Sequence, residues 1–283
     1  MRIYIVIPAH NEEAFLAETL GSLISQTFLP KKIVVVDDNS SDGTAQMVAD
    51  FSLKYPFVSL EKNSSTPTHL PGSKVINAFY KGYNSLDENF DIICKFDADL
   101  IFPENYLERI VSHFSSDPHV GMSGGFCQIN RHERWELENL TDKDHIRGAL
   151  KAYRKECFLQ IGKLRPSMGW DTVDELLAQY HGWKVRTDEE LLVKHLKPTG
   201  QNYGKEAKLR QGEAFYKLHY GFPITFIASL KLAFNKKQPF LLLDYLQGYF
   251  SARNRKLPYL VSENEGAFIR RLRYKKMWAK LFR

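Results

Sequence analysis

Strand-like apolar segments alternate with amphipathic helical segments over the first 130 residues of this 283-residue chain. Largely apolar runs at 3–7, 32–36 and 91–96 are typical of buried strands, and apolar side chains at helical spacing lie between them. This order favours a mainly parallel central sheet with helices on both faces. We therefore expect an α/β protein whose ligands bind beyond the carboxyl ends of its strands.

Local signals place the remaining elements. Asn11 is predicted to be the N-cap of a helix that carries the apolar residues between Phe15 and Ile24. Pro103 is predicted to open another helix at the favoured first position. The other predicted elements are helices over 45–51 and 73–86 and strands over 58–61 and 120–129.

Polar residues follow three of the predicted strands: PAHNEE, DDNSSDG and the DAD of Asp97 to Asp99. Each acid taken singly is as consistent with a helix cap or turn. Three polar strand ends at one sheet edge favour a ligand site instead. Oxygen ligands suit Mg²⁺ or Mn²⁺, which carboxylates share with substrate phosphates. For Asp97 and Asp99 alone, two solvated loop acids are the alternative.

Several classes of protein are disfavoured. No GxGxxG follows the first strand and no GxxxxGK[ST] occurs, which argues against a dinucleotide-binding dehydrogenase and a P-loop enzyme. Three widely spaced cysteines favour a reducing compartment. The apolar run before Pro8 is too short for a signal-peptide core or a membrane span, so we expect a cytoplasmic location.

Charge is distributed unevenly along the chain. Residues 1–200 carry 22 Lys/Arg and 28 Asp/Glu, whereas residues 201–283 carry 17 and 5. Bulky apolar residues mixed with Lys and Arg favour a basic helical extension that lies on the anionic cytoplasmic face of a membrane. Helices packed on the rest of the protein with a solvated basic face are the alternative. No nucleic-acid partner is expected, because no known binding module is evident.

Three segments carry a resemblance to a known family: IVIPAHNEE, IVVVDDNSSDGT and ICKFDADLIF. In this order they resemble the N-terminal half of family 2 glycosyltransferases of the GT-A fold, over roughly residues 1–200. The resemblance implies a GT-A catalytic domain at 1–205, with a donor nucleotide-binding half at 1–100 and an acceptor half at 101–205. The helical basic extension then comprises 206–283.

The resemblance also implies an activity and its site residues. The enzyme would move a sugar from a nucleotide-diphosphate sugar to a hydroxyl of a glycan or lipid-linked glycan, with inversion, in a metal-dependent reaction of cell-envelope polysaccharide synthesis. Asp99 would ligate Mg²⁺ or Mn²⁺. The implied donor-binding residues are Pro8, Ala9 and Asn11 through backbone, Asp38 at the nucleobase, Lys74 at the diphosphate and Asp97 at the ribose or sugar. For Lys74, an exposed helix lysine is the alternative.

The segment MGWDTVDELLAQYHGWKVR extends the resemblance. Asp171 lies eleven residues before Gly182, at the position of the family's general base. The family's preceding Glu is replaced by Trp170, which is expected either to stack on an acceptor sugar or to pack in the core. Asp174 and Glu175 are the second choices for the base and are assigned to the acceptor side. These acids also suit the first turns of a helix.

His195 ends a strand-like run near the place where related folds hold another metal ligand. A histidine that is hydrogen-bonded without a metal is the alternative. Lys197, Thr199 and the stretch to Gly204 are predicted to form a loop over the donor. The Gln-x-x-Arg-Trp signature of processive synthases is missing, which favours single transfer. A sugar nucleotidyltransferase and an inactive sugar-nucleotide- or glycan-binding protein are the alternative functions.

Overall fold

The computed structural model describes residues 1–65, 72–138, 143–197 and 205–281, apart from the side chains of residues 205–207 and 280–281. The chain divides into two compact units. The first comprises Met1–Pro166 and Trp170–Thr199, and the second comprises Ser167–Gly169 and Gly200–Arg283.

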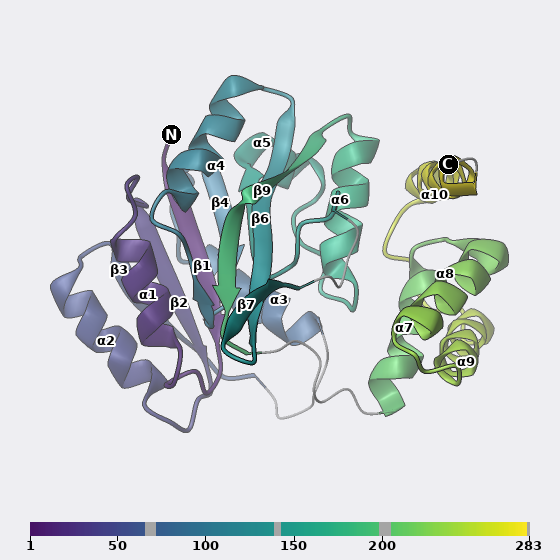
Figure 1. Ribbon diagram of the computed structural model, residues 1–283, viewed down its shortest axis with the longest axis horizontal. Coiled ribbons are helices and arrows are strands. Elements are labelled where there is room, and N and C mark those ends of the chain that lie inside the picture. Colours follow the sequence, from purple (N-terminus) through teal and green to yellow (C-terminus); the bar gives the residue numbers. More distant parts are fainter. Residues whose placement is uncertain (66–71, 139–142, 198–204, 282–283) are drawn as a thin grey trace. The chain divides into compact units, whose positions relative to one another are not determined.

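The first unit is a nine-stranded mixed sheet flanked by helices (Figure 1). Its strands are β1 (Ile3–Ala9), β2 (Lys32–Asp38), β3 (Val58–Asn63), β4 (Ile92–Phe96), β5 (Leu100–Ile101), β6 (Val120–Arg131), β7 (Arg134–Leu137), β8 (Leu150–Arg154) and β9 (Lys184–His195). Its helices are α1 (Leu16–Ile24), α2 (Thr44–Lys54), α3 (Ser73–Tyr83), α4 (Tyr106–Ser116), α5 (Lys155–Gln160) and α6 (Trp170–Tyr180).

The strand order is β3-β2-β1-β4-β8-β6-β9-β5, with β7 paired to β6. The first four strands in this order are parallel to one another. Beyond β4 the sheet is mixed, because β8 runs antiparallel to both β4 and β6, while β6 and β9 are parallel. The predicted α/β sheet with flanking helices is thus confirmed, and its parallel part coincides with the N-terminal strand–helix repeats.

Burial on both faces explains the continuous apolar run of β1. Ile3, Ile5, Val6 and Ile7 are all fully buried. A strand covered on both sides has no solvent face, so its sequence does not alternate between apolar and polar residues. Helix α3 approaches this part of the sheet closely: a Cβ placed on Gly82 would lie 2.6 Å from the Val36 side chain.

Two predicted helix starts are wrong. Asn11 has a φ of 54° and is not an N-cap, because its backbone and side chain bind Ser40 and Ser41 of the next loop instead. Helix α1 therefore begins only at Leu16. Pro103 does not open α4: its carbonyl accepts a hydrogen bond from Tyr106 N in the turn that precedes the helix.

The second unit is helical and contains α7 (Lys205–Lys217), α8 (Gly221–Asn235), α9 (Leu241–Asn254) and α10 (Glu263–Leu281). The predicted C-terminal helices are therefore present. Helices α7 and α9 touch through glycine: a Cβ on Gly212 would lie 1.8 Å from Tyr245 O, and one on Gly248 2.0 Å from Leu209 O. Among the described helices, none is both long and apolar enough to cross a membrane.

Candidate active site

Strand pairing brings the three polar strand ends to one edge of the sheet. Ala9 of β1 is in register with Asp37 of β2, and Val6 of β1 is in register with Lys95 of β4. The segments that follow β1, β2 and β4 are therefore neighbours in space. This edge is the place where a parallel α/β sheet binds ligands.

Asp38, at the end of β2, is buried and held by several hydrogen bonds. Asn63 Nδ2 and Ser65 Oγ each donate to its carboxylate at 2.8 Å, and Ser65 N donates at 3.1 Å. The Asp38 carbonyl oxygen lies 2.7 Å from His10 Nδ1. The carboxylate is therefore fixed in one orientation at the sheet edge.

Three of the other predicted donor residues lie at the end of β1 or just after it. Pro8 and Ala9 are the last two residues of β1. Asn11 joins the loops after β1 and β2, because its Oδ1 accepts a hydrogen bond from Ser41 N at 2.8 Å. Lys74 lies half-buried in the first turn of α3.

Asp97, the first acid of DAD, is paired with a buried lysine. Lys95 points from β4 into the interior, where its Nζ contacts the Asp97 carboxylate and donates to Gly148 O at 3.1 Å. The Asp97 side chain is about one third exposed. One side of the carboxylate is thus held by Lys95 while the rest faces solvent.

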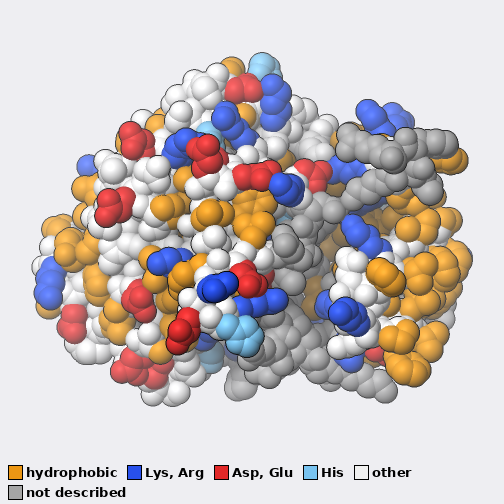
Figure 2. All heavy atoms as spheres, in the orientation of Figure 1, with side chains coloured by type: hydrophobic (Ala, Val, Ile, Leu, Met, Phe, Trp, Pro, Cys, Tyr) orange, Lys and Arg blue, Asp and Glu red, His pale blue; other side chains and the backbone are white. Residues whose placement is uncertain are grey.

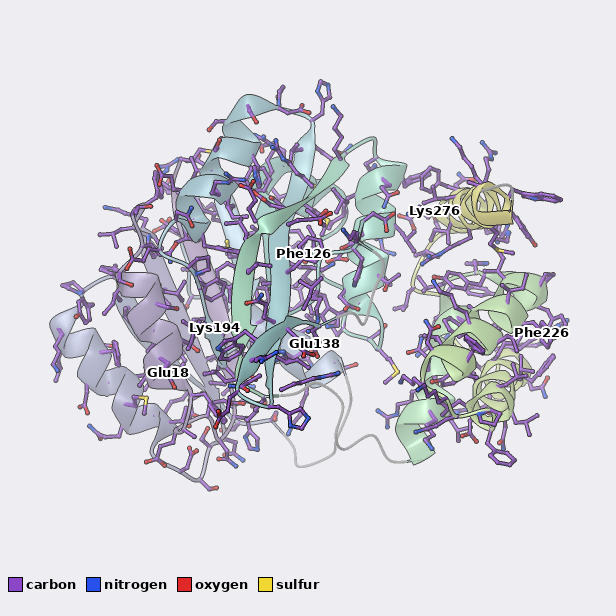
Figure 3. All side chains as sticks on the ribbon, in the orientation of Figure 1. Glu18, Phe126, Glu138, Lys194, Phe226 and Lys276 are labelled. Carbon is purple, nitrogen blue, oxygen red and sulfur yellow. The ribbon has the colours of Figure 1, made fainter. Side chains whose placement is uncertain are left out.

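Asp99 and His195 meet because β5 pairs with β9. The pairing sets Leu100 opposite His195, and His195 Nε2 lies 3.3 Å from Asp99 Oδ2. On the other side of the ring, Nδ1 lies 3.3 Å from Glu138 Oε2. Glu138 in turn contacts Arg147 (Figure 3 labels Glu138).

This arrangement fits a divalent cation. A carboxylate oxygen and an imidazole nitrogen lie 3.3 Å apart. The carboxylate suits Mg²⁺ or Mn²⁺, whereas an imidazole ligand is typical of transition metals, so the pair suits Mn²⁺ better than Mg²⁺. Cys127, Glu138 and His195 also offer atoms within 4.8 Å of one another. That second group suits a metal less well, because Arg147 already contacts Glu138 and burial raises the pKa of the Cys127 thiol to about 11.

Glu12 also belongs to this edge. Lys197 Nζ donates to its Oε2 at 2.6 Å. Burial raises the pKa of Glu12, and the negative charges of Asp99 and Asp97 raise it further, against the opposing effect of Lys197. Lys197 thus contacts the loop after β1. The other residues predicted for a loop over the donor, Thr199 and Gly204, lie outside the described residues.

Asp171 lies in the first turn of α6 with its side chain about one third exposed. His145 Nε2 lies 3.8 Å from Asp171 Oδ2. Burial raises the pKa of Asp171, but His145 and the charge of Lys151 outweigh burial and lower it to about 2. The carboxylate is therefore charged throughout the neutral pH range.

His145 lies between two carboxylates. Its Nδ1 lies 2.9 Å from Glu175 Oε2, and the other Glu175 oxygen accepts a hydrogen bond from Ile146 N at 2.8 Å. Burial lowers the pKa of His145, but Asp171 and Glu175 outweigh it and raise the pKa to about 9. The imidazolium thus connects Glu175 to Asp171.

Asp174 and Glu175 face the interior, where they bind Lys151 of β8. The Lys151 side chain is fully buried, and its Nζ lies 2.8 Å from Asp174 Oδ1 and 3.1 Å from Glu175 Oε1. It also contacts the Asp171 backbone carbonyl. Tyr153 donates to Asp174 at 2.5 Å. Burial raises the pKa of Asp174 to about 6, against the opposing charge of Lys151.

The two buried lysines connect the DAD segment to α6. Lys95 and Lys151 are partners in the β4–β8 register, and their Nζ atoms lie 5.3 and 5.8 Å from the centroid of the Trp170 ring. An aromatic face attracts cations. Trp170 is 6% exposed, which favours the packing alternative over stacking on an acceptor sugar.

The sequence interpretation missed several residues of this site: Glu12, Lys95, Glu138, His145, Arg147, Lys151 and Tyr153. For Lys95 and Lys151 the sequence did contain an indication, because each lysine lies within a mostly apolar strand, as in DIICKF. Lysine is almost never fully buried unless it is paired. His145 and Glu138 carried no comparable pattern, because their partners are distant in sequence.

The sequence model of the family described as Glycosyl transferase family 2 matches residues 4–165, more than half of the chain. The chain belongs to glycosyltransferase family 2. The resemblance read from the three motifs is therefore confirmed, and so is the predicted enzyme class, a glycosyltransferase.

Two curated relatives illustrate the similarity. Probable glycosyltransferase YdaM of Bacillus subtilis (strain 168) is 35% identical over 133 residues, which are 46% of this chain and 30% of that protein. Poly-beta-1,6-N-acetyl-D-glucosamine synthase of Staphylococcus epidermidis (strain ATCC 35984) is 26% identical over 129 residues, 45% of this chain and 29% of that protein. The chain spans about a third of the length of the curated relatives it matches.

Solved structures confirm the GT-A-type fold. A mannosyltransferase from Pyrobaculum calidifontis, in complex with GDP-Man and Mn²⁺, matches with a TM-score of 0.58 and 16% identity, covering 95% of this chain and 78% of that one. S. aureus TarS 1-349 in complex with UDP-GlcNAc matches with a TM-score of 0.57, 16% identity and the same coverage.

Proposed function

We propose that this protein transfers a sugar from a nucleotide-diphosphate sugar to a hydroxyl of a glycan or lipid-linked glycan, with inversion and with the help of Mg²⁺ or Mn²⁺. The observation that carries the proposal is a chain of contacts that joins a strand-end acid to α6. It runs from Asp97 through Lys95, the Trp170 ring and Lys151 to the backbone carbonyl of Asp171. Two structurally similar proteins were solved with GDP-Man and UDP-GlcNAc, which supports a donor of this class.

The donor would lie along the ends of β1, β2 and β4. The fixed Asp38 carboxylate can accept a hydrogen bond from a nucleobase N–H. The exposed side of Asp97 can accept one from a ribose or sugar hydroxyl, while Lys95 holds its other side. Lys74, at the start of α3, is assigned to the diphosphate as a point charge.

Asp99 and His195 would hold the divalent ion. Their facing oxygen and nitrogen atoms supply two ligands, and Glu138 fixes the orientation of the histidine ring. When bound, the ion offsets the negative charge that develops on the departing nucleoside diphosphate.

Asp171 is assigned as the general base. Its carboxylate is charged and partly exposed, so it can accept the proton of an acceptor hydroxyl. The acceptor oxygen forms a bond to the anomeric carbon while the bond from that carbon to the diphosphate oxygen breaks. The bonding electron pair leaves with the nucleoside diphosphate, and attack from the opposite face inverts the anomeric centre.

Asp174 and Glu175 suit the role of base less well. Both are buried and share the Lys151 ammonium group. A base must come within hydrogen-bond reach of the proton that it removes. Their proposed role is to position α6 and His145, and through them Asp171, on the acceptor side of the site.

Calorimetry with UDP-, GDP- and dTDP-sugars tests this proposal. We expect one donor class to bind in the presence of Mn²⁺, and Asp99→Asn to weaken that binding by about tenfold or more. Asp50→Asn on α2 is the matched control and should leave binding unchanged. The proposal fails if no nucleotide-sugar binds in the presence of Mn²⁺. Formation of a nucleotide-sugar from a nucleoside triphosphate and a sugar phosphate would instead support a nucleotidyltransferase.

A further inference from the structure

Helix α8 of the second unit buries Ile224 and a stripe of small residues, while several of its large apolar residues are exposed. Thr225 and Ser229 are fully buried. Phe226, Leu230 and Phe234, by contrast, are 39%, 50% and 83% exposed. Each set has a spacing of four residues, so each forms a separate stripe along the helix. A helix that faces water normally shows the opposite arrangement, with polar residues outside.

The two buried hydroxyl groups of α8 are not stabilised by hydrogen bonds to other described residues. Within the described part of the chain, Thr225 Oγ1 and Ser229 Oγ have no hydrogen-bond partner. Helices surrounded by lipid pack in this way, with small and hydroxyl residues between helices and large apolar residues outward. The close glycine contact of α7 with α9 is a second instance of packing through small residues.

The exposed apolar surface continues from α8 into the start of α9. Phe240 and Leu243 are 78% and 64% exposed. Figure 2 shows hydrophobic side chains gathered over the α8–α9 region, and Figure 3 labels Phe226 on α8. Scattered apolar residues on a surface are normal, whereas a contiguous apolar patch of this kind marks an interaction site.

Charge indicates what covers this surface. Lys231, Lys236 and Lys237 are exposed on α8 and in the turn that follows it. Residues 201–283 carry 17 basic and 5 acidic side chains. Such a surface attracts the headgroups of anionic lipids. A second copy of the chain would bring the same positive charge and be repelled.

The length of α8 determines how it can meet a bilayer. Its 15 residues extend about 22 Å, which is shorter than the hydrocarbon core of about 30 Å. We propose that the outer face of α8 and the α8–α9 turn form a membrane-binding surface that lies in the interface of an anionic bilayer. The apolar side chains enter the headgroup–acyl boundary, and the lysines contact the headgroups. This surface serves attachment and does not depend on the proposed reaction.

Vesicle flotation of the full chain tests the proposal. We expect the protein to float with vesicles of phosphatidylcholine and phosphatidylglycerol, and much less with phosphatidylcholine alone. Phe226→Ser and Phe234→Ser should each lower the partition coefficient by about tenfold. Leu53→Ser is the matched control, because Leu53 is 86% exposed on α2 of the other unit. This control should float like the unmodified chain.

Two further measurements test the contribution of the lysine charges and the depth to which α8 enters the bilayer. Lys236→Gln and Lys237→Gln should each weaken binding to the anionic vesicles by roughly fivefold, and binding to phosphatidylcholine hardly at all. A tryptophan introduced as Phe234→Trp should show additional emission that brominated lipids quench. Circular dichroism checks that each variant is folded, as expected for substitutions at exposed positions.

Three outcomes overturn the proposal. The first is an unmodified chain that does not float with anionic vesicles. The second is equal flotation of the two serine variants and the unmodified chain. The third is a dimer in sedimentation experiments that Phe234→Ser dissociates while vesicles have no effect, since the surface would then be an interface between copies. Donor calorimetry is unaffected by any of these, so the proposed reaction is judged independently.

Discussion

Lys151 of the first unit and Thr225 of the second are both fully buried polar residues, but their surroundings differ. In the first unit, the fully buried Lys151 contacts Asp174, Glu175 and the Asp171 backbone. In the second, the equally buried Thr225 has no hydrogen-bond partner among the described residues. A buried polar group is costly unless it is paired. The difference suggests that the first interior is organised to hold charge for chemistry, whereas the second is organised to present apolar side chains outward.

The largest effect is expected at Asp171, the partly exposed carboxylate that contacts His145. Asp171→Asn should lower turnover by about 10²- to 10⁴-fold, because the amide cannot accept the acceptor's proton. Donor affinity should change little, since Asp171 is assigned to the acceptor side. Single-turnover rates and calorimetry measure the two quantities. Asp50→Asn is again the control, and a variant with full turnover would contradict the assignment of Asp171.

Removal of the Lys151 ammonium group tests whether its contacts with Asp174 and Glu175 also stabilise the fold. Lys151→Met should lower the free energy of unfolding by about 3–5 kcal/mol, because Asp174 and Glu175 lose their buried partner. Urea denaturation measures this difference. Lys54→Met, at the exposed end of α2, should change stability little. Equal effects of the two substitutions would show that Lys151 is not a special buried ion-pair partner.

The charge of His145 gives the first unit a pH dependence. Because the carboxylates raise its pKa from 6.5 to about 9, its contribution to stability is complete below pH 6.5 and is lost as the pH rises through 9. The shift corresponds to about 3 kcal/mol. Melting temperatures between pH 6 and pH 10 should therefore fall more steeply for the unmodified chain than for His145→Asn.

The control for this measurement is His119→Asn, because the His119 side chain is largely exposed. That variant should keep the pH dependence of the unmodified chain. If His145→Asn shows the same slope as the unmodified chain, His145 does not carry the charge that links Glu175 to Asp171.

The sequence predicted the first unit well where a local pattern was sufficient. Apolar runs marked the strands, and the parallel arrangement of β1, β2 and β4 follows from their order, so the strand-end acids were expected at one edge. The sequence could not predict which charged side chains would lie close together in the interior. Lys95 and Lys151 are 56 positions apart in the sequence and become neighbours only through the β4–β8 register.

In the second unit the sequence predicted helices but not their orientation. Helix α8 is apolar around most of its circumference, so periodicity could not separate its buried stripe from its exposed one. The expectation of lipid contact therefore rested on the bulky apolar and aromatic residues mixed with Lys and Arg near the C-terminus. The structure adds Phe226, Leu230 and Phe234 on α8, whose exposure no helical pattern in the sequence indicated.

The smallest expected effect lies at the buried hydroxyl of α8. Thr225→Val keeps the shape of the side chain and removes an unpaired polar group, so it should raise the free energy of unfolding by about 1 kcal/mol. Urea denaturation measures this gain, with Thr27→Val on the first unit as control, because Thr27 donates to Glu108 at 2.8 Å. Vesicle binding should not change, since Thr225 lies on the buried stripe. A loss of stability on Thr225→Val would mean that the Thr225 hydroxyl has a hydrogen-bond partner. The two units would then differ only in the exposed phenylalanines of α8, and no longer in how their buried polar groups are paired.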